Sequence, residues 1–204
     1  FMHILSLVGN APYFDKVVKS GEYSAKGLFT DVSVNWWELA GKTIGIIGMG
    51  NIGRKVAAIA QAFGMEVCYY STSGTAHCKD YPCLPLDELL KVSDIVSVHA
   101  PLNERTLNLL GAREFAMMKP TAYVVNAGRG AIIVEKDLAD AVDNGVIAGA
   151  GIDVFVQEPI PEDHPYLKMK HPERMRLAPH VAWASVEARK RLVAMMADNV
   201  RKGW

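Results

Sequence analysis

Residues 42–53 read K-T-I-G-I-I-G-M-G-N-I-G, and this stretch decides the fold. Residues 43–47 form a short apolar run, typical of a fully buried strand. The run leads directly into Gly48-x-Gly50-x-x-Gly53, and apolar side chains then recur at helical spacing through residue 63. A strand, a glycine-rich turn and a helix form the context in which this fingerprint binds a dinucleotide. We therefore predict a nucleotide site here rather than a plain structural turn.

The three glycines of this motif have separate physical tasks. Gly48 permits the tight turn, and Gly50 lets the backbone come close to a pyrophosphate. Gly53 lets the helix pack closely on the strand. Asn51 opens the helix, whose N-terminus presents free N–H groups and a positive dipole end to phosphates. The motif predicts a phosphate-bearing cofactor at the end of this strand.

The composition is that of an ordinary globular protein, and 204 residues allow one good core and a small appendage. The 22 Lys and Arg residues balance the 22 Asp and Glu residues, so the formal net charge is zero. Nucleic-acid and membrane-surface partners both favour a basic excess, so we expect neither. No apolar run of the sequence is long enough to span a bilayer.

The three cysteines, Cys68, Cys78 and Cys83, match no zinc spacing and leave one thiol unpaired in any disulfide scheme. We therefore expect no metal site, and reduced thiols in a cytoplasmic protein. The N-terminus lacks the pattern of a signal peptide. The chain begins with Phe1 rather than Met, which favours a trimmed or partial chain.

Short apolar runs alternate with helical patterns along the rest of the chain. Such alternation predicts a doubly wound parallel α/β sheet, the Rossmann fold, with six strands. After the first strand and helix we expect strands at 65–70, 94–98, 122–125, 146–153 and 174–177, and helical segments at 86–91, 103–110, 113–118, 135–144 and 185–200. In such sheets ligands bind at the carboxyl ends of the strands, so the polar motifs after the later strands should meet the glycine turn at one edge.

The region before the first strand is predicted to be an N-terminal helical arm. Residues 13–19 look helical, and 27–37 are irregular and aromatic, with Phe29, Trp36 and Trp37. Such an aromatic arm could pack against another domain or form a subunit interface. We favour the interface and expect a homodimer. We divide the chain into this arm (1–40), a dinucleotide-binding domain (41–184) and a C-terminal helix (185–204).

Three side chains that follow strand ends could carry hydride-transfer chemistry. Arg129 lies in N-A-G-R-G, Glu158 in V-F-V-Q-E-P and His180 in A-P-H-V-A-W. A carbonyl that receives a hydride needs a proton, which His can supply near neutral pH. A carboxylate can orient the imidazole, and Arg can bind a substrate carboxylate through two hydrogen bonds. Each residue taken alone could also be an ordinary loop or surface group.

Five motifs together make the chain resemble the D-isomer-specific 2-hydroxyacid dehydrogenases. They are G-M-G-N-I-G, H-A-P-L-N-E-R-T, N-A-G-R-G, G-I-D-V-F-V-Q-E-P and P-H-V-A-W-A, in that order along nearly the whole chain. The resemblance implies that Arg129 binds the substrate carboxylate, that His180 donates the proton and that Glu158 partners His180. The substrate would be a small 2-oxo or 2-hydroxy acid. The W-W-E-L and H-C-K-D-Y-P-C-L-P stretches look most like glycerate dehydrogenases (hydroxypyruvate reductases).

The same resemblance implies a set of residues along the cofactor. Asp153 would contact the nicotinamide end, and Asn51 with Ile52 would meet the pyrophosphate. The whole expected set is Gly48, Gly50, Asn51, Ile52, Gly53, Ser71, Thr72, Ala100, Pro101, Thr106, Asn126, Ala127, Gly128, Asp153, His180 and Trp183.

Two departures from the family pattern affect what we expect of the site. Ser71 takes the position at which the family usually has the Asp that reads the ribose of NAD. No Arg follows closely and Lys79 is the nearest cation in the sequence, so we expect NAD and leave NADP open. The family's substrate domain is largely absent, because only about forty residues precede the first strand.

Two other functions stay open from the sequence. A catalytically inactive, nucleotide-sensing dimerisation module that resembles a corepressor could keep the same fold. Formate or phosphite dehydrogenase chemistry could use the same scaffold with substrate-domain residues that lie outside this chain.

Overall fold

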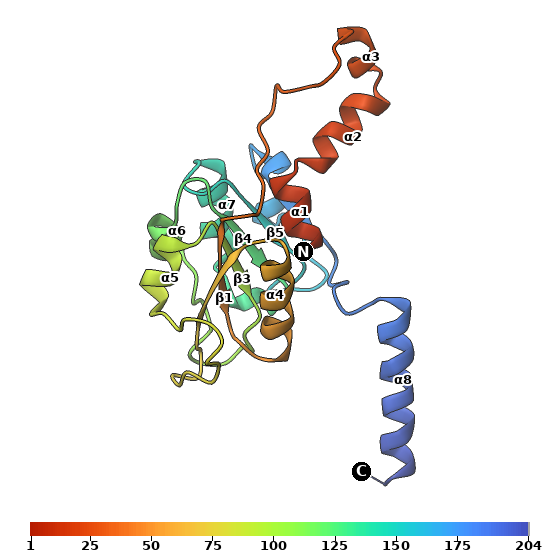
Figure 1. Ribbon diagram of the computed structural model, residues 1–204. Helices are drawn as coiled ribbons and strands as arrows, with labels where there is room; N and C mark the ends of the chain where they lie inside the picture. Colours follow the sequence, from red (N-terminus) through yellow and green to blue (C-terminus); the bar gives the residue numbers. More distant parts are fainter. Residues whose placement is uncertain (204) are drawn as a thin grey trace.

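Six parallel strands form one sheet in the order β2-β1-β3-β4-β5-β6 (Figure 1). The computed structural model describes residues 1–203. The chain leaves the central strand β1 first towards β2 and then, on the other side, towards β3, which creates the switch point at which such sheets bind ligands. The predicted fold class is confirmed. The strands are β1 (Thr43–Ile47), β2 (Glu66–Tyr70), β3 (Ile95–Val98), β4 (Tyr123–Asn126), β5 (Gly149–Ile152) and β6 (Met175–Leu177).

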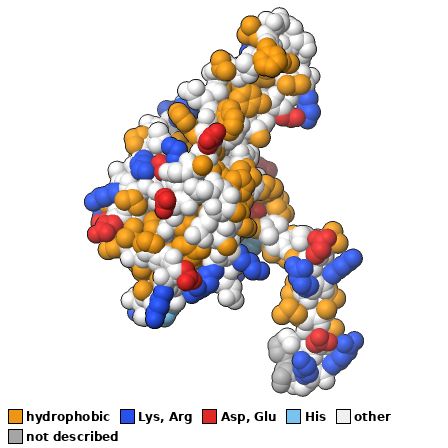
Figure 2. All heavy atoms as spheres, in the orientation of Figure 1, with side chains coloured by type: hydrophobic (Ala, Val, Ile, Leu, Met, Phe, Trp, Pro, Cys, Tyr) orange, Lys and Arg blue, Asp and Glu red, His pale blue; other side chains and the backbone are white. Residues whose placement is uncertain are grey.

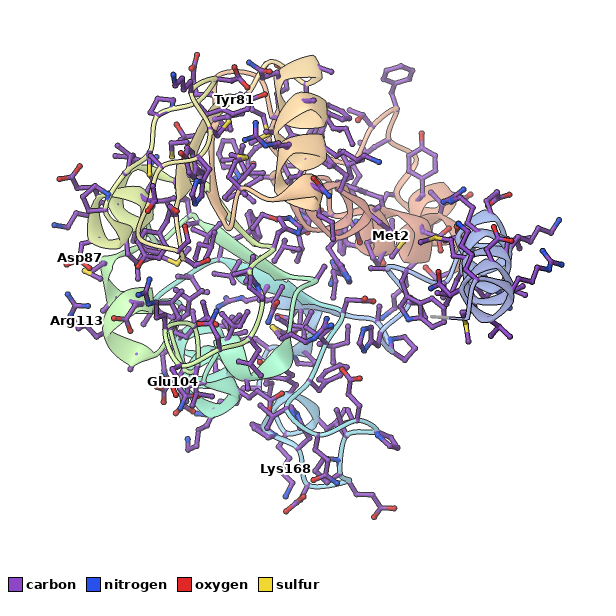
Figure 3. The ribbon with its side chains drawn as sticks, turned by 90° about the horizontal axis from the view of Figure 1, so that it is seen from below. Met2, Tyr81, Asp87, Glu104, Arg113 and Lys168 are labelled. Atoms are coloured by element: carbon purple, nitrogen blue, oxygen red, sulfur yellow. The ribbon has the colours of Figure 1, made fainter. Side chains whose placement is uncertain are left out.

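Helices cover both faces of the sheet, because successive strand side chains point to opposite faces. Ile44 and Ile46 belong to the core cluster that includes residues of α1 (Met2–Val8) and α4 (Asn51–Ala62). Ile47 belongs to the opposite cluster, under α5 (Leu86–Val92), α6 (Ala112–Met117) and α7 (Glu135–Asp143). Asp87 on α5 and Arg113 on α6 lie side by side at 2.8 Å (Figure 3). Three short 3₁₀ helices occur at η1 (Gly130–Ile132), η2 (Pro165–Leu167) and η3 (Pro172–Arg174).

The segment predicted to be a helix at 103–110 has a different structure. It is a series of turns that ends in an isolated bridge between Leu110 and Ile133. The Thr106 hydroxyl accepts the N–H of Asn103 at 2.9 Å and donates to the Pro101 carbonyl at 2.7 Å. These local side-chain bonds compete with the helical pattern, so the prediction was wrong for this segment.

The N-terminal region has two parts with different packing. Helix α1 lies on the sheet, with Ile4 and Leu7 buried and the Gly151 backbone of β5 directly against His3. Helices α2 (Ala11–Lys19) and α3 (Glu22–Lys26), with the irregular segment that follows them, extend away from the sheet (Figure 1). Apolar side chains cover much of this extension in Figure 2. Its exposed large apolar residues are Val18, Leu28, Phe29, Val32, Trp36 and Trp37.

The last helix, α8 (Val186–Arg201), also extends away from the sheet (Figure 1). The predicted N-cap is confirmed, because the Ser185 hydroxyl accepts the N–H of Ala188 at 3.1 Å. None of its described residues is buried. Trp204, the last residue of the predicted C-terminal segment, lies outside the described residues. Across residues 1–203, the structure contains no helix whose length and apolar character would let it cross a membrane.

Candidate active site

The turn after β1 has the geometry that the glycine fingerprint predicts. Gly48 has a φ of +94°, and a Cβ at this position would lie 2.8 Å from the Ala100 nitrogen. A Cβ at Gly53 would collide with the Gly48 carbonyl. By contrast, no atom lies within 4 Å of a Cβ placed on Gly50. The outer glycines are therefore required by the fold, while Gly50 faces free space at the N-terminus of α4.

A pocket of about 440 Å³ lies beside this turn, at the carboxyl ends of the central strands. Its lining brings together three separate sequence motifs that we predicted to meet there. The lining residues are Ile52, His99, Ala100, Pro101, Leu102, Ala127, Gly128 and Arg129. This pocket matches the expected path of a dinucleotide across the sheet edge.

His99 opens the H-A-P-L-N-E-R-T motif and lines this pocket, although we did not predict it as a site residue. Burial lowers the pKa of its imidazole to about 4. Its Nε2 lies 2.9 Å from the Ser97 hydroxyl. The imidazole is therefore neutral at physiological pH and contributes shape rather than charge to the pocket.

Asn126 shapes the turn that carries Arg129. Its side-chain amide donates to the Arg129 carbonyl at 2.9 Å, and its side-chain oxygen accepts the N–H of Gly128 at 3.0 Å. A Cβ on Gly130 would collide with the backbone of Phe155, so only glycine permits the contact between these two loops. That contact places Arg129 beside the loop that holds Glu158.

His180 and Glu158 form the chemically most informative pair of the structure. His180 Nδ1 lies 2.7 Å from Glu158 Oε2. Glu158 Oε1 accepts the N–H of Phe155 at 2.9 Å. These hydrogen bonds, the one to His180 above all, lower the pKa of Glu158, and the nearby charge of Arg129 acts in the same direction. An ionised Glu158 accepts from Nδ1, which leaves Nε2 as the atom that can exchange a proton with a ligand.

Asp153 holds the backbone that carries His180. Its two carboxylate oxygens accept the N–H groups of Val181 and Ala182, each at 2.9 Å, and the side chain is buried. His180 itself has a φ of +54°, which is uncommon outside glycine and clusters at functional sites. The structure thus gives Asp153 a positioning task in addition to the cofactor contact that the resemblance implies. Trp183, which follows in the same segment, is half exposed.

A carboxylate on α7 contacts the Glu158 loop, and the sequence analysis missed this contact. Glu135, at the start of α7, accepts the N–H of Val156 at 2.9 Å and lies 3.1 Å from Nε2 of the buried His164. The two residues are 29 positions apart in the chain and belong to no recognisable motif, so only the tertiary structure could reveal the contact. An apolar pocket of about 540 Å³ is lined by Glu158 and His180 themselves, together with Leu177 and Pro179.

Ser71 and Thr72 follow β2, the first strand in the order of the sheet, whereas His180 follows β6, the last one. Lys79 is the nearest cation in the sequence, but the structure brings a different cation to Ser73. Arg105, from the loop after β3, donates from Nη1 to the Ser73 carbonyl at 2.8 Å. The expected cofactor residues thus include one group after β2, near Ser71, and another after β6, near His180.

A parallel sheet with a dinucleotide turn at its switch point, and an imidazole–carboxylate pair at the same edge, defines the class of nucleotide-dependent oxidoreductase domains. Residues 1–182 match the family model described as "D-isomer specific 2-hydroxyacid dehydrogenase, NAD binding domain". The chain belongs to this family, and the part that it represents is the NAD-binding domain.

Individual relatives agree with this assignment. The chain is 41% identical over 189 residues to a glyoxylate reductase of Korarchaeum cryptofilum, covering 91% of this chain and 55% of that protein. An NADPH-dependent glyoxylate/hydroxypyruvate reductase from Sinorhizobium meliloti, in complex with NADP and malonate, superposes with a TM-score of 0.83 at 30% identity, covering 97% of this chain and 60% of that one. A D-lactate dehydrogenase from Aquifex aeolicus, complexed with NAD and lactic acid, gives 0.82 at 28% identity, with 98% and 64% covered. The chain spans about half the length of the curated relatives that it matches.

Proposed function

We propose that this chain binds NAD(P)H along the carboxyl edge of its sheet and supplies the proton-transfer residues of a D-2-hydroxyacid dehydrogenase. The hydrogen bond of 2.7 Å between His180 and Glu158, at the same sheet edge as the glycine turn, is the observation that carries this proposal. The substrate class is a small 2-oxo acid, and the names of the relatives favour glyoxylate or hydroxypyruvate.

The residues of the chain fit this reaction in the following way. The nicotinamide cofactor supplies the hydride when it is bound. Arg129 would hold the carboxylate of the 2-oxo acid through charge-assisted hydrogen bonds. His180 would give its Nε2 proton to the carbonyl oxygen as that oxygen gains charge, and Glu158 would stabilise the imidazolium and fix its orientation. In the reverse direction His180 would accept the proton of the hydroxyl group.

The free space at Gly50 supports a pyrophosphate position at this turn. The first N–H groups of α4 have no partner within the helix, and the space around a Cβ on Gly50, at the same helix end, is open. We infer that the phosphates occupy this position, close to the backbone of Gly50, Asn51 and Ile52.

Replacing Gly50 by valine tests this placement without disturbing the fold. Gly50 has φ −82° and ψ −161°, which valine can adopt. Gly50 is the N-cap of α4, where glycine is preferred to valine, so we expect the free energy of unfolding to fall by about 1 kcal/mol, which leaves the chain folded. The affinities for NADH and NADPH should both fall by about 10–100-fold, because overpacking costs about 1–3 kcal/mol. Fluorescence titration of the reduced nicotinamide measures both affinities.

Ala58→Val is the matched control for the glycine variant. It adds methyl groups to an exposed position of the same helix, away from the turn, and should leave both affinities unchanged. Unchanged cofactor affinity in Gly50→Val would contradict the proposed position of the pyrophosphate.

We also propose that the chain acts in the cytoplasm as a homodimer. The extension of α2, α3 and residues 27–38 carries the exposed aromatic side chains of Phe29, Trp36 and Trp37, which a monomer would leave in water. The division into an arm (1–40), a cofactor domain (41–184) and a C-terminal helix (185–204) belongs to this proposal. The nucleotide-sensing alternative is not favoured, because a binding module has no need of a hydrogen-bonded Glu158–His180 pair.

A further inference from the structure

The loop after β3 contacts the loop after β2, where we expect the adenosine part of the cofactor to bind. The loop after β3 crosses the end of β1 and reaches the loop after β2, where Arg105 Nη1 donates to the Ser73 carbonyl at 2.8 Å. The Arg105 backbone is held in turn, because its N–H donates to the Asn103 side chain at 2.9 Å. The guanidinium therefore lies at the segment that follows β2, which reads the ribose in this fold.

The segment beside Arg105 offers hydroxyl groups and no carboxylate. The Ser71 and Ser73 hydroxyls lie 3.0 Å apart, and Ser73 Oγ lies 2.9 Å from His77 Nε2. Residues 71–79 contain neither Asp nor Glu. The first acid, Asp80, lies 3.6 Å from Arg54.

The other charged groups around this segment do not oppose an anion. Arg54 Nη2 also donates to the His77 carbonyl at 3.1 Å, which anchors the segment to α4. Glu104, labelled in Figure 3, is exposed and forms no ion pair with Arg105 among the described residues. The Ser71 and Ser73 hydroxyls both donate to the Thr75 carbonyl, so the donors left for an anion are mainly those of the Arg105 guanidinium.

We propose that Arg105, beside Ser71 and Ser73, binds a phosphate on the 2′ position of the adenosine ribose, so that the chain prefers NADPH to NADH. This inference rests on the proposed function and specifies its cofactor. A guanidinium has five N–H donors in a planar fork, and one bond to the Ser73 carbonyl leaves donors for phosphate oxygens. The carboxylate with which an NAD site accepts the ribose hydroxyls, and which would repel a phosphate, is replaced by Ser71.

Dissociation constants of the 204-residue chain for NADPH and NADH, from fluorescence titration, test the inference. We expect tighter binding of NADPH by the wild-type chain. Arg105→Gln should weaken NADPH binding by about 10–100-fold, as expected for losing a hydrogen bond to a charged group. Its affinity for NADH should stay within about threefold, because that cofactor has no 2′-phosphate, and its thermal unfolding should match the wild type.

Lys79→Gln is the matched control, since it removes the same charge from the segment after β2 without a contact to Ser73 among the described residues. We expect it to change NADPH affinity by less than about threefold, because an exposed charge without a contact at the site is largely screened. Equal losses of NADPH affinity in the two variants would overturn the role of Arg105. Wild-type binding of NADH as tight as that of NADPH would overturn the preference but leave the proposed function intact. A folded chain that binds neither cofactor would contradict the proposed function as well.

Discussion

Replacing His180 by alanine should lower kcat by about 10²–10⁴-fold, the range that positioned acid–base groups contribute. The measurement needs this domain within a polypeptide of the length of its relatives, since the chain alone covers about half of that length. The affinity for the reduced cofactor should change by less than about threefold. This separation is expected because the proton at Nε2 is needed only as the carbonyl oxygen gains charge, whereas the glycine turn holds the cofactor.

His171→Ala provides a control of closely matched chemistry. His171 Nδ1 lies 3.1 Å from Glu173, so it is also an exposed imidazole–carboxylate pair, but it lies before β6 and outside both pockets of the site. Its loss should leave kcat unchanged. Wild-type turnover in the His180→Ala variant would remove His180 from the mechanism.

Replacing Asp153 by alanine should destabilise the chain by about 2–4 kcal/mol, because two backbone N–H groups lose their acceptor in a buried position. Urea denaturation measures this change. Amide hydrogen exchange adds a local readout, and we expect the N–H groups of Val181 and Ala182 to lose protection more than the strand amides of β5 do. These two amides follow His180, so their release would show that Asp153 holds the loop of the proton donor.

Asp163→Ala is the control for this variant. Asp163 is an exposed carboxylate in the loop before η2 with no hydrogen bond or ion pair among residues 1–203, and its loss should change stability by less than about 0.5 kcal/mol. An Asp153→Ala chain that keeps both its stability and the protection of the two amides would show that the carboxylate does not hold this loop.

The sheet could be predicted from the sequence because each strand is a short apolar run with a clear stop. The glycine fingerprint placed β1 correctly, and Gly48 and Gly53 occupy the crowded positions that the motif requires. The segment at 103–110 failed because the hydroxyl of Thr106 organises the backbone locally, and this bond leaves no trace in the spacing of apolar residues. The sequence placed α1 in the N-terminal arm, whereas the structure packs it on the sheet. The apolar residues of α1 predict that one face is buried, but they do not indicate which element covers that face.

In the site, too, residues within local sequence motifs could be predicted, whereas contacts between residues far apart in the chain could not. Motifs located Arg129, Glu158 and His180 because each follows a strand end. The contacts of Arg105 with Ser73 and of Glu135 with Val156 join residues 32 and 21 positions apart, and neither pair has a sequence signature. Sequence proximity therefore pointed to Lys79, whereas the topology of the sheet brings Arg105 across β1.

Turnover of hydroxypyruvate and pyruvate with NADPH and NADH, followed by chiral separation of the products, tests the central claim most directly. The assay uses the domain within a polypeptide of its relatives' length. We predict oxidation of the reduced cofactor with formation of the D-2-hydroxy acid from at least one of these substrates. Formation of the L-enantiomer would contradict the assignment of the reaction. If the protein binds the cofactor tightly but turns over neither acid nor glyoxylate, the result would contradict the proposal that it is a dehydrogenase. It would favour a nucleotide-sensing module.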